Sequence, residues 1–155
     1  MAEVERIIEA PIDQVWVVLA DGWSYSDWVV GNTHVRDVDP HWPEVGARLH
    51  HQVGAWPLLV ADVSVVEEVD PPRRLVLRAQ LRRLGRGRIT LELTPLAADQ
   101  TKITMEEHFE SGPARWLMMK FNDLVLHQRN AEGLRRISDL ATRRYAAEQV
   151  GTSSG

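Results

Sequence analysis

One glutamate in this sequence stands where a carboxyl group could do chemistry. Around it, apolar residues recur at every second position, as Ile103, Met105 and Phe109. By this alternation Glu107 shares their face of a strand, which should point inward. A carboxylate on a buried face costs free energy unless it is paired, protonated or used. A bulge at Glu106 and Glu107 would instead turn the side chain to solvent. Glu107 is therefore a candidate for ligand binding and for acid–base catalysis.

Three other polar residues fall on surfaces that the pattern predicts to be buried. His51 lies in a strand pattern between apolar residues, and Gln128 lies within an apolar helical stripe. Arg6 likewise falls on the apolar face of the first predicted strand. A few polar groups in apolar surroundings are typical of small-molecule pockets. We expect His51, Glu107 and Gln128 to orient a ligand, and His51 is the second candidate for acid–base catalysis.

The sequence offers no metal or cofactor signature. His50 and His51 are adjacent on a predicted strand and so face opposite sides, while His34 and His41 match no ligand spacing. The chain has no cysteine, which excludes disulfides and cysteine-rich metal sites. A nucleophile elbow, a P-loop, a dinucleotide fingerprint and an H-E-x-x-H motif are all missing from the sequence. We expect neither a metal nor a cofactor.

Aromatic residues are concentrated near the N-terminus, because five of the six tryptophans precede residue 57. Trp23 and Trp28 could stack on a ligand at the mouth of a cavity. Alternatively they pack as core or lid residues, and for Trp28 the two interpretations stay equally open.

Charge is distributed unevenly along the chain, whose net charge is −4. Residues 1–72 carry 13 acidic and 3 basic residues, whereas residues 73–155 carry 9 acidic and 15 basic residues. Seven arginines crowd the segment 73–88, which could form a phosphate-binding patch. No aromatic residues interleave with them, and Arg78 and Arg82 fall on the solvent face of a strand. A solvated face that blocks aggregation is the favoured interpretation, so we expect no nucleic-acid partner.

These residues must be positioned by helices and strands. Along the chain the spacing of apolar residues changes from helical to strand periodicity and then back to helical. Pro11 suits the first turn of a helix, and Ser24 with Asp27 resembles a capping box for a second helix that Gly31 would stop. The expected strands are 4–9, 34–38, 49–53, 59–65, 75–82, 89–93 and 102–109, and the expected helices are 11–20, 24–30 and 113–150.

The final helix carries two apolar stripes. The first comprises Leu117, Phe121, Leu124, Gln128 and Ala131, and the second comprises Leu134, Ser138, Ala141 and Tyr145. This helix alone is large enough to cover the sheet. We predict one α+β domain over residues 1–150, with a curved seven-stranded antiparallel sheet wrapped around the long helix. Residues 151–155 should form a disordered tail.

A curved sheet around one helix leaves space between them. We predict a cavity of at least about 300 Å³, the lower end of small-molecule pocket sizes. Its lining should comprise Trp28, Leu77, Leu91, Met105, Phe109, Phe121 and Leu124.

Several segments resemble the SRPBCC superfamily, the helix-grip fold of START domains and birch-pollen-allergen-like proteins. The resemblance extends to its bacterial polyketide cyclase/dehydrase and lipid-transport group, and covers roughly residues 2–145. The matching segments are Ile8 to Trp16 (IEAPIDQVW), Asp21 to Trp28, Trp42 to Gly46 (WPEVG), Asp70 to Arg73 (DPPR) and Thr101 to Thr104. The resemblance implies a hydrophobic cavity, and family members include ligand carriers and aromatase/cyclases.

Three functions fit these observations. We favour a protein that binds a lipid- or polyketide-like apolar small molecule in an internal cavity. The first alternative is a polyketide cyclase or dehydratase, in which Glu107 or His51 would do acid–base work. The second is a non-catalytic regulatory module that interacts through the arginine-rich hairpin. No segment reads as a signal peptide or a membrane span, so we expect a cytoplasmic protein without membrane insertion, either monomer or homodimer.

Overall fold

The computed structural model describes residues 2–53, 60–81, 85–112 and 123–155. The elements, in chain order, are β1 (Ala2–Ile8), α1 (Ile12–Ala20), the 3-10 turn η1 (Gly22–Ser24), α2 (Tyr25–Trp28), β2 (Asn32–Val38), β3 (Arg48–Val53), β4 (Val60–Asp70), β5 (Arg74–Leu81), β6 (Gly85–Ala97), β7 (Gln100–Ser111) and α4 (Asp123–Ser153).

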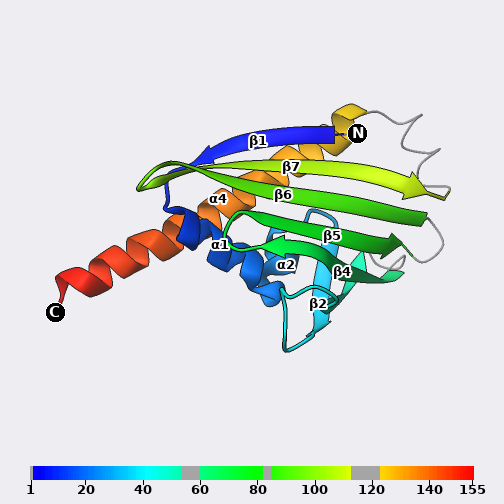
Figure 1. Ribbon diagram of the computed structural model, residues 1–155, viewed down its shortest axis with the longest axis horizontal. Helices are drawn as coiled ribbons and strands as arrows, with labels where there is room; N and C mark the ends of the chain where they lie inside the picture. Colours follow the sequence, from blue (N-terminus) through cyan, green and yellow to red (C-terminus); the bar gives the residue numbers. More distant parts are fainter. Residues whose placement is uncertain (1, 54–59, 82–84, 113–122) are drawn as a thin grey trace.

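The strands form one seven-stranded antiparallel sheet in the order β1-β7-β6-β5-β4-β3-β2. Strands β2 to β6 each pair with the next strand in sequence, while β1 pairs with β7 and forms the far edge (Figure 1). Such short-range connections follow from the turn signals between the period-two segments. The predicted α+β helix-grip architecture is confirmed.

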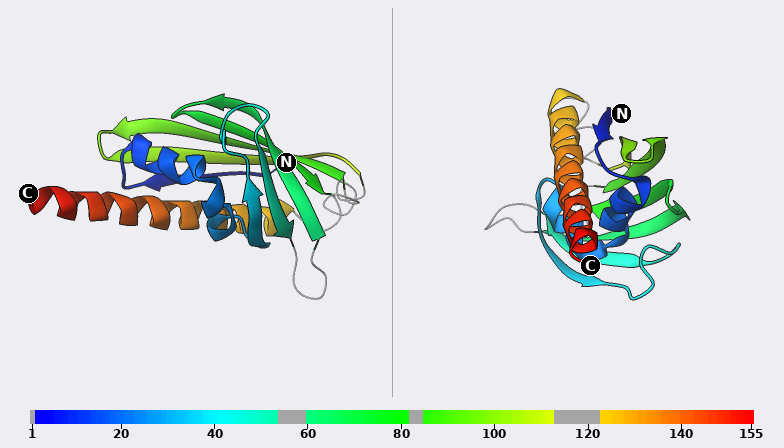
Figure 2. Two further views of the ribbon diagram at one scale, coloured as in Figure 1. Left: turned by 90° about the horizontal axis from the view of Figure 1, so that it is seen from below. Right: turned by 90° about the vertical axis from the view of Figure 1, so that its left-hand side faces the viewer.

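The helices lie on one side of the curved sheet. Figure 2 shows α4 running along this side, with its C-terminal end projecting past the strands. Helix α4 contacts β1 and β7, and α1 and α2 both pack against α4. The concave face therefore encloses the apolar sides of all three helices.

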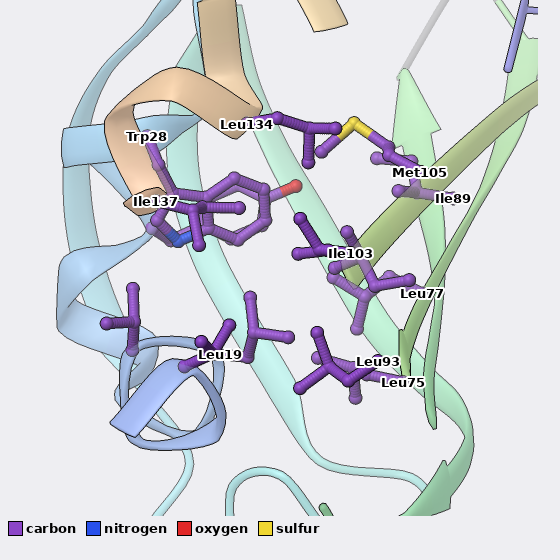
Figure 3. Close-up of a cluster of buried hydrophobic side chains, with 14 of the residues drawn as sticks. Leu19, Trp28, Leu75, Leu77, Ile89, Leu93, Ile103, Met105, Leu134 and Ile137 are labelled. Atoms are coloured by element: carbon purple, nitrogen blue, oxygen red, sulfur yellow. The ribbon is translucent and has the colours of Figure 1, made fainter. Parts of the chain in front are cut away.

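The inward residues of the sheet change in character along the strands. At one end they are large and aliphatic, and include Leu75, Leu91, Leu93 and Ile103 (Figure 3). Helix residues Leu19 and Ile137 complete this core. Burying such a side chain contributes about 1.5–3 kcal/mol, so this apolar end holds the fold together.

The rotation of α4 differs from the prediction at its N-terminal end. The second predicted stripe is correct, since Leu134, Ser138 and Ala141 are buried. Because a helix keeps one face toward its partner, steps of four residues back from Leu134 lead to Asn130 and Leu126, which are buried as well. The first predicted stripe faces outward in the described residues, where Leu124, Gln128 and Ala131 are exposed.

A glycine lets α4 approach α2 closely. A Cβ atom at Gly133 would lie 3.1 Å from the carbonyl oxygen of Trp28. The helix therefore tolerates a residue of low helix propensity here because its backbone meets another backbone.

The structure corrects the predicted start of the second helix and the predicted end of the last helix. Ser24 does not cap α2 by its side chain, because its Oγ donates to the carbonyl oxygens of Val18 and Asp21. Asp21 caps the preceding turn instead, accepting a hydrogen bond from the Trp23 amide. At the other end α4 runs to Ser153, so most of the expected tail is helical. The predicted start of this helix at Pro113 lies outside the described residues.

Arg6 is exposed, although it lies between the buried Val4 and Ile8 in β1. Strand β1 is an edge of the sheet, where a long arginine side chain can reach solvent past the apolar face.

Candidate functional site

The opposite end of the concave face carries polar residues. Strand register places His51 of β3 directly across from Asp62 of β4, and Leu49 across from Ser64. His51, Asp62 and Ser64 are all buried, with exposed fractions of 2%, 3% and 0%. The inward face of β4 thus carries Asp62 and Ser64, although the alternation of Ala61, Val63 and Val65 would favour the other face as the buried one.

The Ser64 hydroxyl connects these buried strand residues to helix α2. Ser64 Oγ lies 3.1 Å from His51 Nε2 and 3.2 Å from the hydroxyl of Tyr25. Asp62 Oδ2 lies 3.9 Å from the same His51 nitrogen. The Tyr25 ring packs against the rings of Trp28 and His51, at centroid distances of 5.0 and 5.1 Å. We refer to Tyr25, His51, Asp62 and Ser64 as the polar cluster.

Burial shifts the protonation of the cluster toward uncharged forms. Desolvation raises the pKa of Tyr25 to about 12. Desolvation, helped by the charges of Arg36 and His50, lowers the pKa of His51 to about 4. Desolvation also raises the pKa of Asp62 to about 6, against the opposing hydrogen bond from the Val63 amide. Near neutral pH the cluster therefore holds a neutral imidazole beside a carboxylate of weakened acidity.

Two buried atoms of the cluster have no hydrogen-bond partner among the described residues, namely His51 Nδ1 and Asp62 Oδ2. The directions of these hydrogen bonds fix the tautomer of His51. If Tyr25 donates to Ser64 and Ser64 donates to Nε2, both hydroxyl protons are satisfied and Nδ1 carries the free N–H. The cluster then offers one donor, Nδ1–H, and one acceptor, Asp62 Oδ2, to a further polar group.

Glu107 lies on the inward face, as the strand alternation predicts. It stands across from Ile89 of β6 and is 6% exposed. Its carboxylate accepts a hydrogen bond from the Arg129 guanidinium of α4, which forms an ion pair between sheet and helix. Arg129 is thus the cation that compensates the buried carboxylate.

Two spaces border these polar groups. A cavity of about 20 Å³ is bounded by Trp28, Met105, Glu107, Arg129 and Gly133 among others, and has room for about one water molecule. A hollow of about 530 Å³ lies on the opposite face of the sheet, where its lining includes the cross-strand row Val63, Gln80, Arg86 and Ser111. The second space has the size of an ordinary small-molecule pocket.

The residues expected to line a single pocket do not do so in the described part of the chain. Leu77 and Leu91 are fully buried in the apolar core, and Trp28 and Met105 border the 20 Å³ cavity. Phe109 is half-buried and its ring lies over Gly87. Leu124 is 55% exposed and Gln128 is exposed, because α4 turns that side outward. Phe121 lies outside the described residues.

Sequence reasoning missed Tyr25, Asp62, Ser64 and Arg129. A signal for two of them existed: Asp62 and Ser64 are spaced two apart in a strand, so both share one face. Both faces of β4 carry valines, however, and the alternation of Ala61, Val63 and Val65 indicates the wrong face as the buried one. Arg129 lies next to Asn130, a member of the buried stripe of α4. The stripe predicted for this part of the helix faces outward instead.

Arginines and glutamates on the outer face of the sheet form ion pairs with one another. On the other face of the sheet Arg74, Arg78 and Arg88 pair with Glu67, Glu68 and Glu92. Within the described ranges no group of three or more histidine, aspartate or glutamate side chains is arranged to hold a metal ion. None of the described helices combines the length and the hydropathy that a membrane crossing needs.

The curved sheet gripping α4 defines a helix-grip protein. A family model described as polyketide cyclase / dehydrase and lipid transport matches residues 1–142, and the chain belongs to this family. The resemblance seen in the sequence is thereby confirmed. No curated protein matches the chain in sequence.

Solved structures share the fold at low sequence identity. A Nitrosomonas europaea protein superposes with a TM-score of 0.71 at 15% identity, covering 93% of this chain and 95% of its own. The Zhui aromatase/cyclase from a Streptomyces species gives 0.71 at 20% identity, covering 92% and 93%. The di-domain aromatase/cyclase BexL gives 0.64 at 16% identity, covering 88% of this chain and 45% of its own.

Proposed function

We propose that this protein binds a mainly apolar, lipid- or polyketide-like small molecule between the sheet and α4, with the polar cluster as its anchor. The observation that carries the proposal is the pair of unpartnered buried atoms, His51 Nδ1 and Asp62 Oδ2. A buried polar atom without a partner costs about 1–3 kcal/mol, so folding alone gives no reason to bury two of them. A ligand with a hydroxyl or carbonyl group would satisfy one or both.

The surroundings of the cluster support the same function. Trp28, Met105 and Glu107 lie near the junction of α2, α4 and the sheet, where apolar area meets the Glu107–Arg129 ion pair. Apolar walls with a few oriented polar groups bind small molecules specifically. We infer that Trp28, His51, Met105, Glu107 and Phe109 contact the ligand.

The test uses a neutral apolar fluorophore, N-phenyl-1-naphthylamine, titrated into the intact protein. We expect saturable binding that Met105→Trp weakens, because the larger ring fills space on the inward face. Thr104→Trp is the matched control, since residue 104 alternates with 105 and points to the other face of β7. Equal binding by wild type and Met105→Trp contradicts this location. Native mass spectrometry of freshly purified protein would identify a retained ligand.

A cyclase or dehydratase is the second candidate. It is favoured by the approach of two titratable side chains, His51 and Tyr25, to one oxygen, Ser64 Oγ, with Asp62 beside them. A substrate oxygen hydrogen-bonded to His51 Nδ1 or Asp62 Oδ2, the two unpartnered atoms, would lie within the reach that proton transfer requires.

Glu107→Gln and Asp62→Asn separate the two candidates. Assayed with candidate polyketides, a carrier shows altered ligand affinity in the variants and no turnover in any protein. Wild-type turnover that Asp62→Asn abolishes and Glu107→Gln preserves would assign acid–base work to the polar cluster. Turnover lost only in Glu107→Gln would assign it to Glu107.

A further inference from the structure

The inward face of the sheet carries three small residues side by side at its polar end. Strand pairing places Ser64 of β4 across from Ala79 of β5, and Ala79 across from Gly87 of β6. Residues directly opposite each other share a face, and neighbouring strands lie about 4.8 Å apart, so the three residues span about 10 Å. The next inward row toward the core carries larger side chains, those of Val66, Leu77, Ile89 and Glu107. We refer to Ser64, Ala79 and Gly87 as the small-residue row.

Ala79 is the accessible position of this row. Ser64 is buried, and its hydroxyl lies 3.2 Å from that of Tyr25. Gly87 is buried as well, because ring atoms of Phe109 lie 3.6 and 3.7 Å from the place that a Cβ would take there. Ala79 lies between them and is only partly buried, whereas the inward leucines that precede it in β5 are fully buried. The surface above Ala79 is therefore left open between two aromatic side chains.

A buried acceptor without a partner lies at one end of the row. Asp62 Oδ2 has no hydrogen-bond partner among the described residues, and the side chain is 1% exposed. Asp62 Oδ2 and Ser64 Oγ lie 3.9 and 3.1 Å from the same atom, His51 Nε2, so the free oxygen is on the Ser64 side of the imidazole. Desolvation raises the pKa of Asp62 to about 6, so at pH 8 the carboxylate is ionised and can only accept hydrogen bonds. A group that satisfies it must be a donor.

We propose that the ligand carries a flat aromatic ring with an O–H or N–H donor at its edge, and that the ring lies over Ala79 with the donor on Asp62. This inference rests on the proposed function, and it adds the shape and the hydrogen bonding of the ligand. Alanine projects one carbon from the sheet, so a thin ring fits where a leucine would leave no room. The aromatic rings of Tyr25 and Phe109 favour a π system over a saturated skeleton. Ala79 is then the residue that determines specificity for ring shape.

The test compares three ten-carbon ring systems by calorimetry on the intact protein at pH 8: 2-naphthol, 2-methoxynaphthalene and 1-adamantanol. The first is flat and has a donor, the second is flat without a donor, and the third has a donor on a globular skeleton. We expect 2-naphthol to bind about tenfold tighter than 2-methoxynaphthalene, because it alone of the two can donate to the carboxylate. We also expect it to bind about tenfold tighter than 1-adamantanol.

Two variants assign these preferences to residues. Ala79→Leu should weaken 2-naphthol about tenfold, because the longer side chain occupies the place of the ring. Gln80→Leu is the matched control, since Gln80 is exposed on the other face of the same strand and should leave binding unchanged. Asp62→Leu should weaken 2-naphthol about tenfold and leave 2-methoxynaphthalene within about twofold. Circular dichroism of each variant excludes unfolding as the cause.

The outcomes separate this inference from the proposed function. If N-phenyl-1-naphthylamine binds but 2-naphthol and 1-adamantanol bind alike, the proposed function stands and the flat ring is overturned. Equal binding of 2-naphthol and 2-methoxynaphthalene, or equal weakening of both by Asp62→Leu, overturns the donor to Asp62. Unchanged binding of 2-naphthol by Ala79→Leu overturns the position of the ring. If neither N-phenyl-1-naphthylamine nor any of the three probes binds, the proposed function fails and takes this inference with it.

Discussion

His51 Nε2 and Asp62 Oδ2 lie 3.9 Å apart on neighbouring strands, both buried and both shifted toward the uncharged state. The two shifts act on stability with opposite signs. The raised pKa of Asp62 favours the folded state at low pH, and this contribution is lost as pH rises to about 6. The lowered pKa of His51 favours the folded state above its ordinary value, and this contribution is lost as pH falls to about 4.

The first prediction follows from this opposition. Between about pH 4 and pH 6 the two contributions to stability offset each other in wild type. In Asp62→Asn only the contribution of His51 should remain. We expect its free energy of unfolding to rise with pH more steeply than that of wild type, and to exceed it by roughly 2 kcal/mol at pH 7. Urea unfolding at several pH values measures both. Parallel pH profiles for the two proteins would contradict the assignment, and Asp99→Asn in an exposed turn is the control.

The second prediction concerns the Glu107–Arg129 ion pair. Arg129→Met leaves a buried carboxylate without its cation, which should lower the free energy of unfolding by about 1–3 kcal/mol, since Arg129 is itself partly exposed. Glu107→Gln should cost less, because a neutral amide still accepts from the guanidinium. The double variant Glu107→Leu/Arg129→Met should recover most of the loss. Chemical denaturation measures all three, and additive losses in the double variant would refute the coupling.

The third prediction tests the close approach of α4 to α2. Gly133→Val places a branched side chain against the Trp28 carbonyl, 3.1 Å from where its Cβ must lie. We expect a loss of roughly 1–3 kcal/mol in stability despite the better helix propensity of valine over glycine. Gly151→Ala in the same helix meets no atom within 4 Å and should not destabilise. A Gly133→Val protein as stable as wild type would show that α2 can move away from α4 without loss of stability.

The fourth prediction concerns the arginine-rich hairpin. Three of its five described arginines, at 74, 78 and 88, are paired with glutamates, which reduces the net charge available to a polyanion. Duplex DNA should therefore bind weakly and be released by about 200 mM salt, as counterion release requires. Fluorescence anisotropy with a labelled duplex measures this. Tight binding at that salt concentration would restore the nucleic-acid interpretation. Arg82, which also belongs to the hairpin, lies outside the described residues.

Sequence patterns sufficed for the architecture because each element carried its own periodicity. The alternation from Leu75 to Leu81 and from Ile103 to Phe109 identified strands, and Glu107 was placed inward by the same rule. They failed where two faces looked alike. In β4 the valines at 63 and 65 make the outer face the more apolar one, so alternation alone would place Asp62 and Ser64 toward solvent. Sheet register with His51 reverses that assignment, and register is not written in either strand alone.

By itself the sequence determined the order and kind of the elements, the antiparallel sheet and the helix that it grips. Those properties depend on local spacing of apolar residues and on turn residues, which neighbours along the chain supply. Only the tertiary structure decided which residues meet, such as Tyr25 with Ser64 and Arg129 with Glu107. Each of these relationships joins segments far apart in the chain, and depends on strand register, sheet curvature and the rotation of α4. These are set by packing of the whole domain rather than by any segment of it.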